Sequence, residues 1–366
     1  MREAILVLNA GSSSIKFSVF RDAVPVRGQI GGIGVVPFFE ARGLEGKPDI
    51  AGVHDHSSAL GVLLTWLRQD DAMGCIEAVG HRVVHGGSTF VDPVRVTPEI
   101  MDALANLEPL APHHQPHNVA AMRAVAELWP EVVQVACFDT AFHASMPREA
   151  QETGLPRNYT EAGIRRYGFH GLSYTYVVQA LPGMTEDGVL PERVIAMHLG
   201  NGGSLCAIKN AHSIATTMGY STTDGIPMAT RSGAVDPGAL IAVMRRDGLD
   251  ADGLEDLLYN RAGMLGLSGG LSADMKFLLD SDDPAARQAI DFYCYRITRE
   301  VGSLASALGG LDALVFTGGI GANSQAIRDN ICQRLGWLGV PGKVAVYAFD
   351  TDEEAMIARN VRGLII

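Results

Sequence analysis

Three short segments rich in glycine, serine and asparagine have the composition of phosphate-binding turns. They are Asn9–Ser14, His198–Ser204 and Gly318–Asn323. Turns without bulky side chains expose several backbone N–H groups together, and such concave arrays bind phosphate oxygens well. The third segment precedes a helical pattern, so its N–H groups would add to those of a helix N-terminus. The sequence therefore predicts a site for a phosphorylated ligand.

Each segment by itself is more typical of an ordinary tight turn. None contains the Walker sequence Gly-x-x-x-x-Gly-Lys-[Ser/Thr], and none fits Gly-x-Gly-x-x-Gly after a first strand. The combination favours phosphate binding, because the first two segments each lie between two apolar strands. In addition, Lys16 follows the first segment.

The overall charge limits which partners this site could serve. The formal net charge is −12, with 29 Lys and Arg against 41 Asp and Glu. Such a surplus of negative charge argues against nucleic acid or an anionic membrane as the main partner. An anionic substrate would therefore need a local cluster of Arg, Lys and His side chains.

The elements around the first two turns repeat. Apolar strands are expected at Ala4–Leu8 and Ile15–Phe20, and again at Arg193–Leu199 and Leu205–Ile208. A unit that recurs about 190 residues later is far too widely spaced for a solenoid. With 366 residues, too many for one ordinary core, the repeat predicts two domains of related α/β fold.

The remaining pattern alternates strands and helices. Thr97 has the properties of a helix N-cap, with Pro98 in the first turn and an acidic residue after it. We expect short strands and loops between residues 28 and 55 and a loop at 318–323. Other strands are expected at Ile76–Val84, Val132–Phe138 and Ala313–Thr317, and other helices near Leu60–Leu67, Val119–Trp129 and Ala285–Leu308 and from Asp352.

Cysteine usage and hydropathy indicate the compartment. The five cysteines lie far apart without a C-x-x-C pair, which favours free thiols in a reducing cytosol. The N-terminus has no basic region and no cleavage site, and no run approaches the roughly 20 apolar residues of a membrane span. We expect a soluble, cytoplasmic protein. The cysteines are Cys75, Cys137, Cys206, Cys294 and Cys332.

Six longer motifs identify a family. In this order along the chain they resemble motifs of the acetate kinases, and the resemblance extends from residue 4 to about residue 358. Chance similarity over such long motifs is very improbable. The motifs are Leu8–Lys16, Gly80–Gly87, Phe138–His143, Arg166–Gly171, Thr217–Gly219 and Thr230–Gly233.

The resemblance implies a fold and an activity. The fold would be two lobes of duplicated ribonuclease H-like α/β structure with an interlobe nucleotide cleft, the first lobe formed by residues 1–143 and 352–366 and the second by 144–351. The activity would be reversible transfer of the γ-phosphoryl group of ATP to acetate, giving acetyl phosphate and ADP by direct in-line transfer. The family also implies Mg²⁺, with Mn²⁺ as a possible substitute, and a homodimer built through the second lobe.

The resemblance assigns four catalytic residues. Phosphoryl transfer depends mostly on positioning and charge neutralisation, and acetate needs no base because it is already deprotonated at neutral pH. Arg82 and Arg231 would contact the carboxylate and the transferring group, and His170 would donate to the phosphoryl oxygens. Asp139, which stands at a strand end, would orient Arg82 or Mg²⁺.

Binding residues follow by the same resemblance. Asn9 and Glu353 match the Mg²⁺ positions, and few direct protein ligands suit this ion. Val84, His114 and Phe169 would form the acyl site, where a valine favours acetate over propionate by about 1–3 kcal/mol per methylene. The nucleotide would contact Ser12, Ser14, Lys16, His198, Asn201, Gly202, Asp274, Met275, Lys276, Gly319, Ile320, Gly321, Ala322 and Asn323.

Five positions depart from the family pattern. Lys276 replaces an arginine and Ala322 a glutamate at the adenosine end, which leaves the identity of the phosphoryl donor open. His113 replaces a leucine of the acyl pocket and could shrink or polarise it. Thr222 replaces a proline, and Ala234 an aspartate or asparagine.

Two other activities and one other class remain as alternatives. A propionate kinase, or a kinase that uses another phosphoryl donor such as pyrophosphate, is an alternative within the same class of enzyme. An actin-like ATP-binding protein would not need Arg82, Arg231 and His170 in their motifs. Zinc bound at His113–His117 is disfavoured, because no cysteine or acidic residue stands at ligand spacing.

Overall fold

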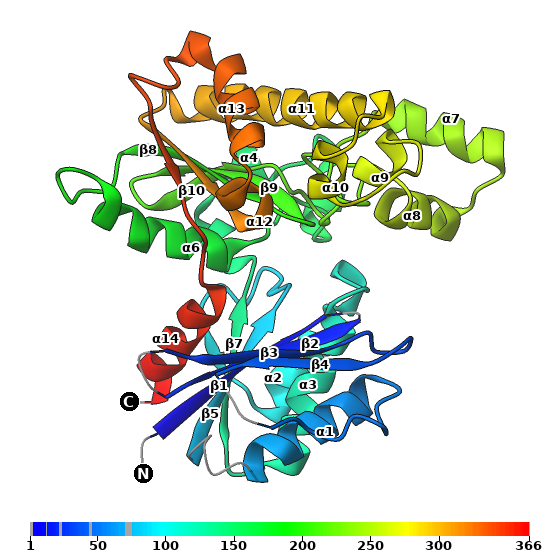
Figure 1. Cartoon of the computed structure of the whole chain (residues 1–366), viewed down its shortest axis with the longest axis vertical. Coiled ribbons are helices and arrows are strands. Elements are labelled where there is room, and N and C mark those ends of the chain that lie inside the picture. The colour runs from blue at the N-terminus through cyan, green and yellow to red at the C-terminus, as the bar shows by residue number, and fades with distance from the viewer. Residues whose placement is uncertain (1–2, 12, 22–23, 44–45, 70–74, 366) are drawn as a thin grey trace. The chain divides into compact units, whose positions relative to one another are not determined.

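The computed structural model describes residues 3–11, 13–21, 24–43, 46–69 and 75–365 of the chain. It forms two compact units (Figure 1). The first unit is Met1–Ala141 with Asp352–Ile366, and the second is Phe142–Thr351.

The first unit is built on a seven-stranded sheet in the order β4-β3-β2-β1-β5-β7-β6. Strands β1 to β4 form an antiparallel meander, whereas β5 is parallel to β1, and β7 is parallel to β5. The elements are β1 (Glu3–Ala10), β2 (Ser14–Phe20), β3 (Val26–Gly31), β4 (Phe38–Arg42), α1 (His56–Gln69), β5 (Cys75–Val83), β6 (Val94–Arg95), α2 (Pro98–Ala105), α3 (Gln115–Leu128), β7 (Val133–Phe138) and α14 (Glu353–Ile365).

Helices cover both faces of this sheet. Buried apolar residues of α1 and α3 pack on the face that carries Leu6, Leu8 and Val79. Helix α14 packs on the opposite face, and Gly80 allows the close approach, because a Cβ there would lie 2.4 Å from Ile357. Alternation along β5 puts Arg82 on the same face as Gly80. The fold therefore turns Arg82 toward α14.

The second unit has a five-stranded sheet in the order β10-β9-β8-β11-β12. Strands β8, β9 and β10 are antiparallel neighbours, and β11 runs parallel to both β8 and β12. The elements are α4 (Arg148–Gln151), α5 (Arg157–Glu161), α6 (Gly171–Ala180), β8 (Arg193–Leu199), β9 (Gly203–Lys209), β10 (His212–Thr216), α7 (Pro237–Asp247), α8 (Ala251–Asn260), α9 (Gly263–Leu267), α10 (Met275–Leu279), α11 (Pro284–Leu308), β11 (Ala313–Thr317), α12 (Gly318–Asn323), α13 (Gln325–Arg334) and β12 (Ala345–Ala348).

This second sheet is also covered on both faces. The long helix α11 packs with α13 on the face of Ile195, Met197 and Leu199, and α6 packs on the face of Val194 and Ala196 (Figure 1). Successive residues of β8 thus enter opposite cores, which explains why this strand reads as a continuous apolar run.

The two sheets share one topology. In each, an antiparallel three-stranded meander is followed by two parallel strands, so that β3-β2-β1-β5-β7 corresponds to β10-β9-β8-β11-β12. The β1–β2 and β8–β9 turns occupy equivalent places. The predicted duplication of a ribonuclease H-like α/β unit is confirmed.

Most of the helices and strands expected from the sequence are present in the structure. Thr97 caps α2 by accepting a hydrogen bond from the Ile100 amide at 3.3 Å. The segment 318–323 was wrongly expected to be a loop, because it forms the short helix α12 directly after β11. Within the described residues, no helix is long and apolar enough to cross a membrane.

The cysteines are free where their side chains are described. Cys137, Cys206 and Cys294 are buried and Cys332 is partly buried, whereas the side chain of Cys75 lies outside the described residues. Burial raises the pKa of Cys137 and Cys206 to about 12. Both thiols therefore stay protonated and unreactive at neutral pH.

Candidate active site

Arg82 and Asp139 meet at the carboxyl ends of two neighbouring parallel strands. Arg82 is the penultimate residue of β5, and Asp139 directly follows β7. The Nε and Nη2 groups of Arg82 donate to Oδ2 of Asp139 at 3.0 and 2.7 Å. Asp139 is 2% exposed, so this charge-assisted pair holds the guanidinium in a fixed orientation.

Glu353, at the first turn of α14, is the second acid beside Arg82. Its Oε2 lies 3.4 Å from Nη1 of Arg82, whereas Oε2 of Glu354 lies 3.8 Å from Nη1 of Arg27. Burial opposes the charge of Arg82, but Asp139 and Glu353 outweigh it and raise the pKa of this guanidinium. Arg82 is thus a permanent cation, and the two acids make the site rich in oxygen ligands.

Asn118, which the sequence analysis missed, joins two of the predicted segments. It lies on α3, is 2% exposed, and accepts from the Val84 amide at 3.0 Å. Its amide nitrogen donates to the Ala10 carbonyl at 3.0 Å. One buried side chain therefore connects the end of β5 with the start of the β1–β2 turn.

The histidine-rich segment before α3 contributes in different ways. His114 is partly buried at the helix N-cap, whereas His113 is exposed. His117 stacks on His56 with 4.3 Å between the ring centroids, and Nε2 of His56 lies 2.6 Å from the Gly11 carbonyl. No sequence pattern indicated this histidine pair, which contacts the β1–β2 turn.

The β1–β2 turn holds the predicted phosphate and metal ligands of the first unit. Asn9 and Lys16 face each other across the hairpin, Asn9 partly buried and Lys16 exposed. The Gly11 amide donates to the Ser14 carbonyl at 2.9 Å, which closes the turn. Ser12, also predicted to bind the nucleotide, lies outside the described residues.

In the second unit, His170 and His198 lie side by side. Their rings stack with centroids 4.4 Å apart and an interplanar angle of 19°. Nδ1 of His170 lies 2.8 Å from the Ser204 hydroxyl, and Nδ1 of His198 lies 2.8 Å from the Ser173 hydroxyl. Each imidazole is therefore held through its Nδ1 by a neighbouring serine hydroxyl.

His170 has an unusual backbone. It adopts a left-handed conformation, with φ 61° and ψ 26°, at the N-cap of α6. Such a conformation costs a bulky residue about 1–3 kcal/mol and persists where the surroundings enforce it. Phe169, predicted to touch the acyl group, is 2% exposed, and its carbonyl lies 2.9 Å from Nε2 of His143.

Arg231 approaches the β8–β9 turn from a separate loop. A Cβ added to Gly202 would lie 3.7 Å from Nη1 of Arg231 and 3.6 Å from Nε2 of His170, so the two side chains converge on this turn. Gly233, at φ 70°, lets the Arg231 loop pack on the backbone of Ile226, where a Cβ would lie 2.5 Å away. Arg231 also donates to the Thr222 carbonyl at 3.3 Å.

Burial lowers the pKa of Arg231, and the neighbouring Tyr259 opposes that shift. A guanidinium stays protonated in proteins nevertheless. A cation that is partly removed from water interacts more strongly with developing negative charge than one at the surface. Arg231 and His170 therefore form the strongest candidate anion site of the second unit.

The remaining predicted nucleotide residues fall in two places. The helix α12 carries Gly319–Asn323, and its Gly319 amide lies beside the β8–β9 turn, 3.9 Å from a Cβ added to Gly200. On α10, Asp274 caps the helix, Lys276 is exposed, and Met275 is 5% exposed in the core. The Met275 side chain thus packs in the core, and only the backbone of Met275 could contact a ligand.

The donor chemistry of the first unit fits Mg²⁺. Asn9 and Glu353 offer oxygen ligands, and Mg²⁺ keeps waters and phosphate oxygens for most of its positions. In the part of the chain that the structure describes, no three His, Cys, Asp or Glu side chains gather as a metal cage.

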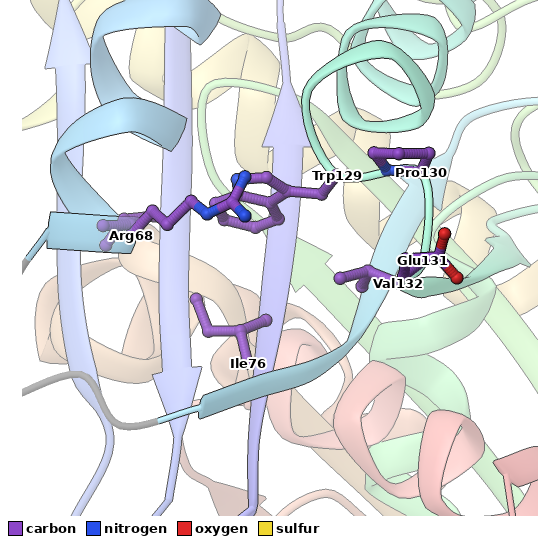
Figure 2. Close-up of a pocket in the computed structure, with 7 residues that line it drawn as sticks. Arg68, Ile76, Trp129, Pro130, Glu131 and Val132 are labelled. Carbon is purple, nitrogen blue, oxygen red and sulfur yellow. The ribbon is translucent and has the colours of Figure 1, made fainter.

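A separate pocket of about 380 Å³ lies elsewhere in the first unit (Figure 2). It is lined mainly by apolar side chains near the first residues of β5 and β7, together with the exposed Arg68 and Glu131. This is the opposite end of the parallel strands from Arg82 and Asp139. None of the predicted site residues lines it.

Comparison with known proteins identifies the family. Residues 4–360 match the acetokinase family. An acetate kinase of Rhodopseudomonas palustris (strain TIE-1) is 46% identical, with 99% of this chain and 98% of the relative covered. An acetate kinase of Rickettsia akari (strain Hartford) is 39% identical, with 99% of each covered.

Solved structures agree with the sequence comparison. The crystal structure of Porphyromonas gingivalis acetate kinase is 35% identical with a TM-score of 0.87, and all of each chain is covered. A propionate kinase from Francisella tularensis subsp. tularensis SCHU S4 is 33% identical, also with a TM-score of 0.87, with 98% of each chain covered. The chain therefore belongs to the acetokinase family.

Proposed function

We propose that the protein transfers the γ-phosphoryl group of ATP reversibly to acetate, giving acetyl phosphate and ADP. The observation that carries the proposal is the convergence of Arg231 and His170 on the Gly202 turn. A guanidinium and an imidazole at a glycine-rich turn suit a phosphoryl group that carries spread negative charge. The full-length likeness to acetate kinases supports this acceptor.

The first unit supplies the groups for the carboxylate and the metal. Acetate is already ionised at neutral pH, so it needs a fixed cation and no base. Arg82 is that cation, because Asp139 holds Nε and Nη2 while Nη1 lies 3.4 Å from Glu353. Asn9 and Glu353 would hold Mg²⁺ through oxygen ligands, and the ion would neutralise phosphate charge.

The second unit supplies the groups for the nucleotide. Arg231 stabilises the charge of the transferring group, and His170 donates a hydrogen bond to its oxygens. His198, Asn201 and Gly202 contact the phosphates from the β8–β9 turn, and the backbone of α12 with Asp274 and Lys276 contacts the adenosine. Ser14 and Lys16 bind phosphate from the first unit.

Val84 sets the acyl preference in this proposal. It directly follows β5 and is held by Asn118, and its branched side chain leaves little room for a longer acyl chain. The alternative is propionate as acceptor, supported by the likeness to a propionate kinase. His113 is exposed, and this exposure gives no support to a role in shrinking the acyl pocket.

We also propose a cytoplasmic homodimer built through the second unit. Large aromatic side chains are exposed there, with Trp337 69%, Tyr295 49% and Phe292 39% accessible. Such residues are enriched in protein interfaces. The free cysteines suit a reducing compartment.

One assay tests the activity. Acyl hydroxamate formation is measured with acetate, propionate and butyrate, each with ATP, GTP or pyrophosphate and Mg²⁺. We expect acetate with ATP to give the highest kcat/KM, and propionate to follow about 10- to 100-fold lower. Acyl phosphate from none of the pairs would overturn the proposal, and a higher kcat/KM with propionate would establish the alternative acceptor.

A further inference from the structure

Behind His170 lies a buried chain of two hydroxyl groups. The Ser204 hydroxyl lies 2.8 Å from Nδ1 of His170, and the Tyr174 hydroxyl lies 2.5 Å from that of Ser204. Both Ser204 and Tyr174 are 0% exposed. Buried polar groups in such a chain polarise one another and hold a fixed arrangement.

The other ring nitrogen of His170 points the opposite way. Nε2 lies 3.6 Å from a Cβ added to Gly202, and Nη1 of Arg231 lies 3.7 Å from the same point. The hydroxyl chain therefore contacts the nitrogen away from the candidate anion site, and Nε2 faces it. One nitrogen of the His170 ring, Nδ1, thus contacts the buried hydroxyl groups, and the other, Nε2, faces the candidate anion site.

We propose that Ser204 and Tyr174 are positioning residues that hold His170 in the tautomer with its proton on Nε2. The inference rests on the proposed function, in which Nε2 donates to the transferring phosphoryl group. The Tyr174 O–H donates to Ser204, and the Ser204 O–H donates to the lone pair of Nδ1. The proton of neutral His170 is then on Nε2.

The direction of these hydrogen bonds follows from the chemistry at Nε2. In a neutral imidazole one nitrogen donates and the other accepts. If Nδ1 carried the proton, Nε2 would turn a lone pair toward a phosphoryl oxygen, and like partial charges would repel. The partner of the remote nitrogen sets the tautomer of a functional histidine, so Ser204 as donor gives the productive form.

Tyr174 is held firmly enough for this task. It lies on α6, one helical turn after His170, and its amide donates to the His170 carbonyl at 3.1 Å. Its ring meets the buried ring of His143 edge-on with centroids 5.6 Å apart. The left-handed backbone of His170 and the stack on His198 fix the other end of the chain.

The kinetic test uses Tyr174→Phe and Ser204→Ala, with Tyr293→Phe as the matched control. Tyr293 is a second buried tyrosine of the same unit, 1% exposed on α11, and its hydroxyl has no hydrogen-bond partner among the described residues. We expect Tyr174→Phe to lower kcat about 2- to 12-fold and Ser204→Ala at least tenfold, from the loss of one or more hydrogen bonds. KM for acetate should change less than twofold, and Tyr293→Phe should leave kcat unchanged.

A second readout does not depend on turnover. In protein labelled with ¹⁵N at histidine, the ring nitrogens report which one carries the proton, and His170→Asn assigns the signals. We expect the Nε2–H form of His170 alone in the wild type and a mixture of tautomers, with a changed titration midpoint, in Ser204→Ala.

The outcomes separate the two proposals. An Nδ1–H tautomer in the wild type, or equal kcat for Tyr174→Phe and Tyr293→Phe, overturns the positioning role. A wild type that shows the Nε2–H tautomer but forms no acyl phosphate overturns the proposed function and leaves the tautomer assignment standing.

Discussion

Replacement of Asn118 by leucine tests how the first unit holds its candidate site together. Leucine has nearly the same size and no hydrogen-bonding group. The Val84 amide would lose its acceptor, and the Ala10 carbonyl would lose a donor. Because Asn118 is 2% exposed, water cannot replace either partner without entering the core.

The size of the effect follows from those two hydrogen bonds. A buried N–H left without an acceptor costs about 1–3 kcal/mol, and the lost bond to the carbonyl adds about 0.5–1.5 kcal/mol. We expect Asn118→Leu to lower the free energy of unfolding of the first unit by about 1.5–4.5 kcal/mol. Since Val84 and the β1–β2 turn then lose their common support, KM for acetate should rise as well.

Urea unfolding followed by tryptophan fluorescence measures the loss. Trp66 and Trp129 belong to the first unit and Trp337 to the second, so the signal reports mainly on the unit that is changed. The control is Asn106→Leu, at an exposed position of the same unit, for which about 0.5 kcal/mol or less is expected. A loss below 1 kcal/mol for Asn118→Leu relative to this control would refute the reasoning.

Three further predictions concern charge. Arg231→Ala should lower kcat by about 10³ or more if the guanidinium stabilises the transferring phosphoryl group, and a loss below tenfold in the hydroxamate assay would reject that role. Glu353→Gln should raise the Mg²⁺ concentration needed for half-maximal rate, whereas Glu354→Gln, whose carboxylate lies beside Arg27, should not; equal effects would contradict the metal assignment. Burial lowers the pKa of His81 and of His143 to about 4, below the usual 6.5. Their contribution to stability is therefore present above pH 6.5 and lost as the pH falls toward 4, by up to about 3 kcal/mol each. Urea unfolding midpoints recorded between pH 7 and pH 4 measure this loss of stability. A midpoint that does not change with pH would show that the two imidazole rings are not buried as neutral groups.

The duplicated fold was predictable because its signal is local. A strand, a glycine-rich turn and a second strand are encoded by adjacent residues, and the hydrophobic pattern gives their order directly. The proximity of Arg82 and Asp139 was also predictable, since neighbouring parallel strands bring their carboxyl ends to the same edge of the sheet. The helix at 318–323 could not be predicted locally, because its glycines are more typical of a loop.

Contacts between distant segments could not be predicted from the sequence. The hydrogen bonds of Asn118 to Val84 and Ala10 depend on how α3 packs, and no local pattern marks an asparagine as buried. The left-handed backbone of His170 is similarly invisible, because only its surroundings enforce it. The structure was needed to find the side chains that hold the reactive groups in place.

Two residues of the proposed adenosine site, Ala322 and Lys276, depart from the family pattern, and the departures have unequal consequences. Ala322 lacks a carboxylate, but its carbonyl still accepts from Nη1 of Arg328 at 2.6 Å, as the Gly321 carbonyl does at 2.9 Å. Backbone geometry at α12 is thus fixed without the missing side chain. Lys276 is exposed on α10, where a lysine cannot offer the planar stacking surface of an arginine. A weakened preference for adenine over guanine should therefore arise from Lys276, and Lys276→Arg should strengthen it while Ala322→Glu should not.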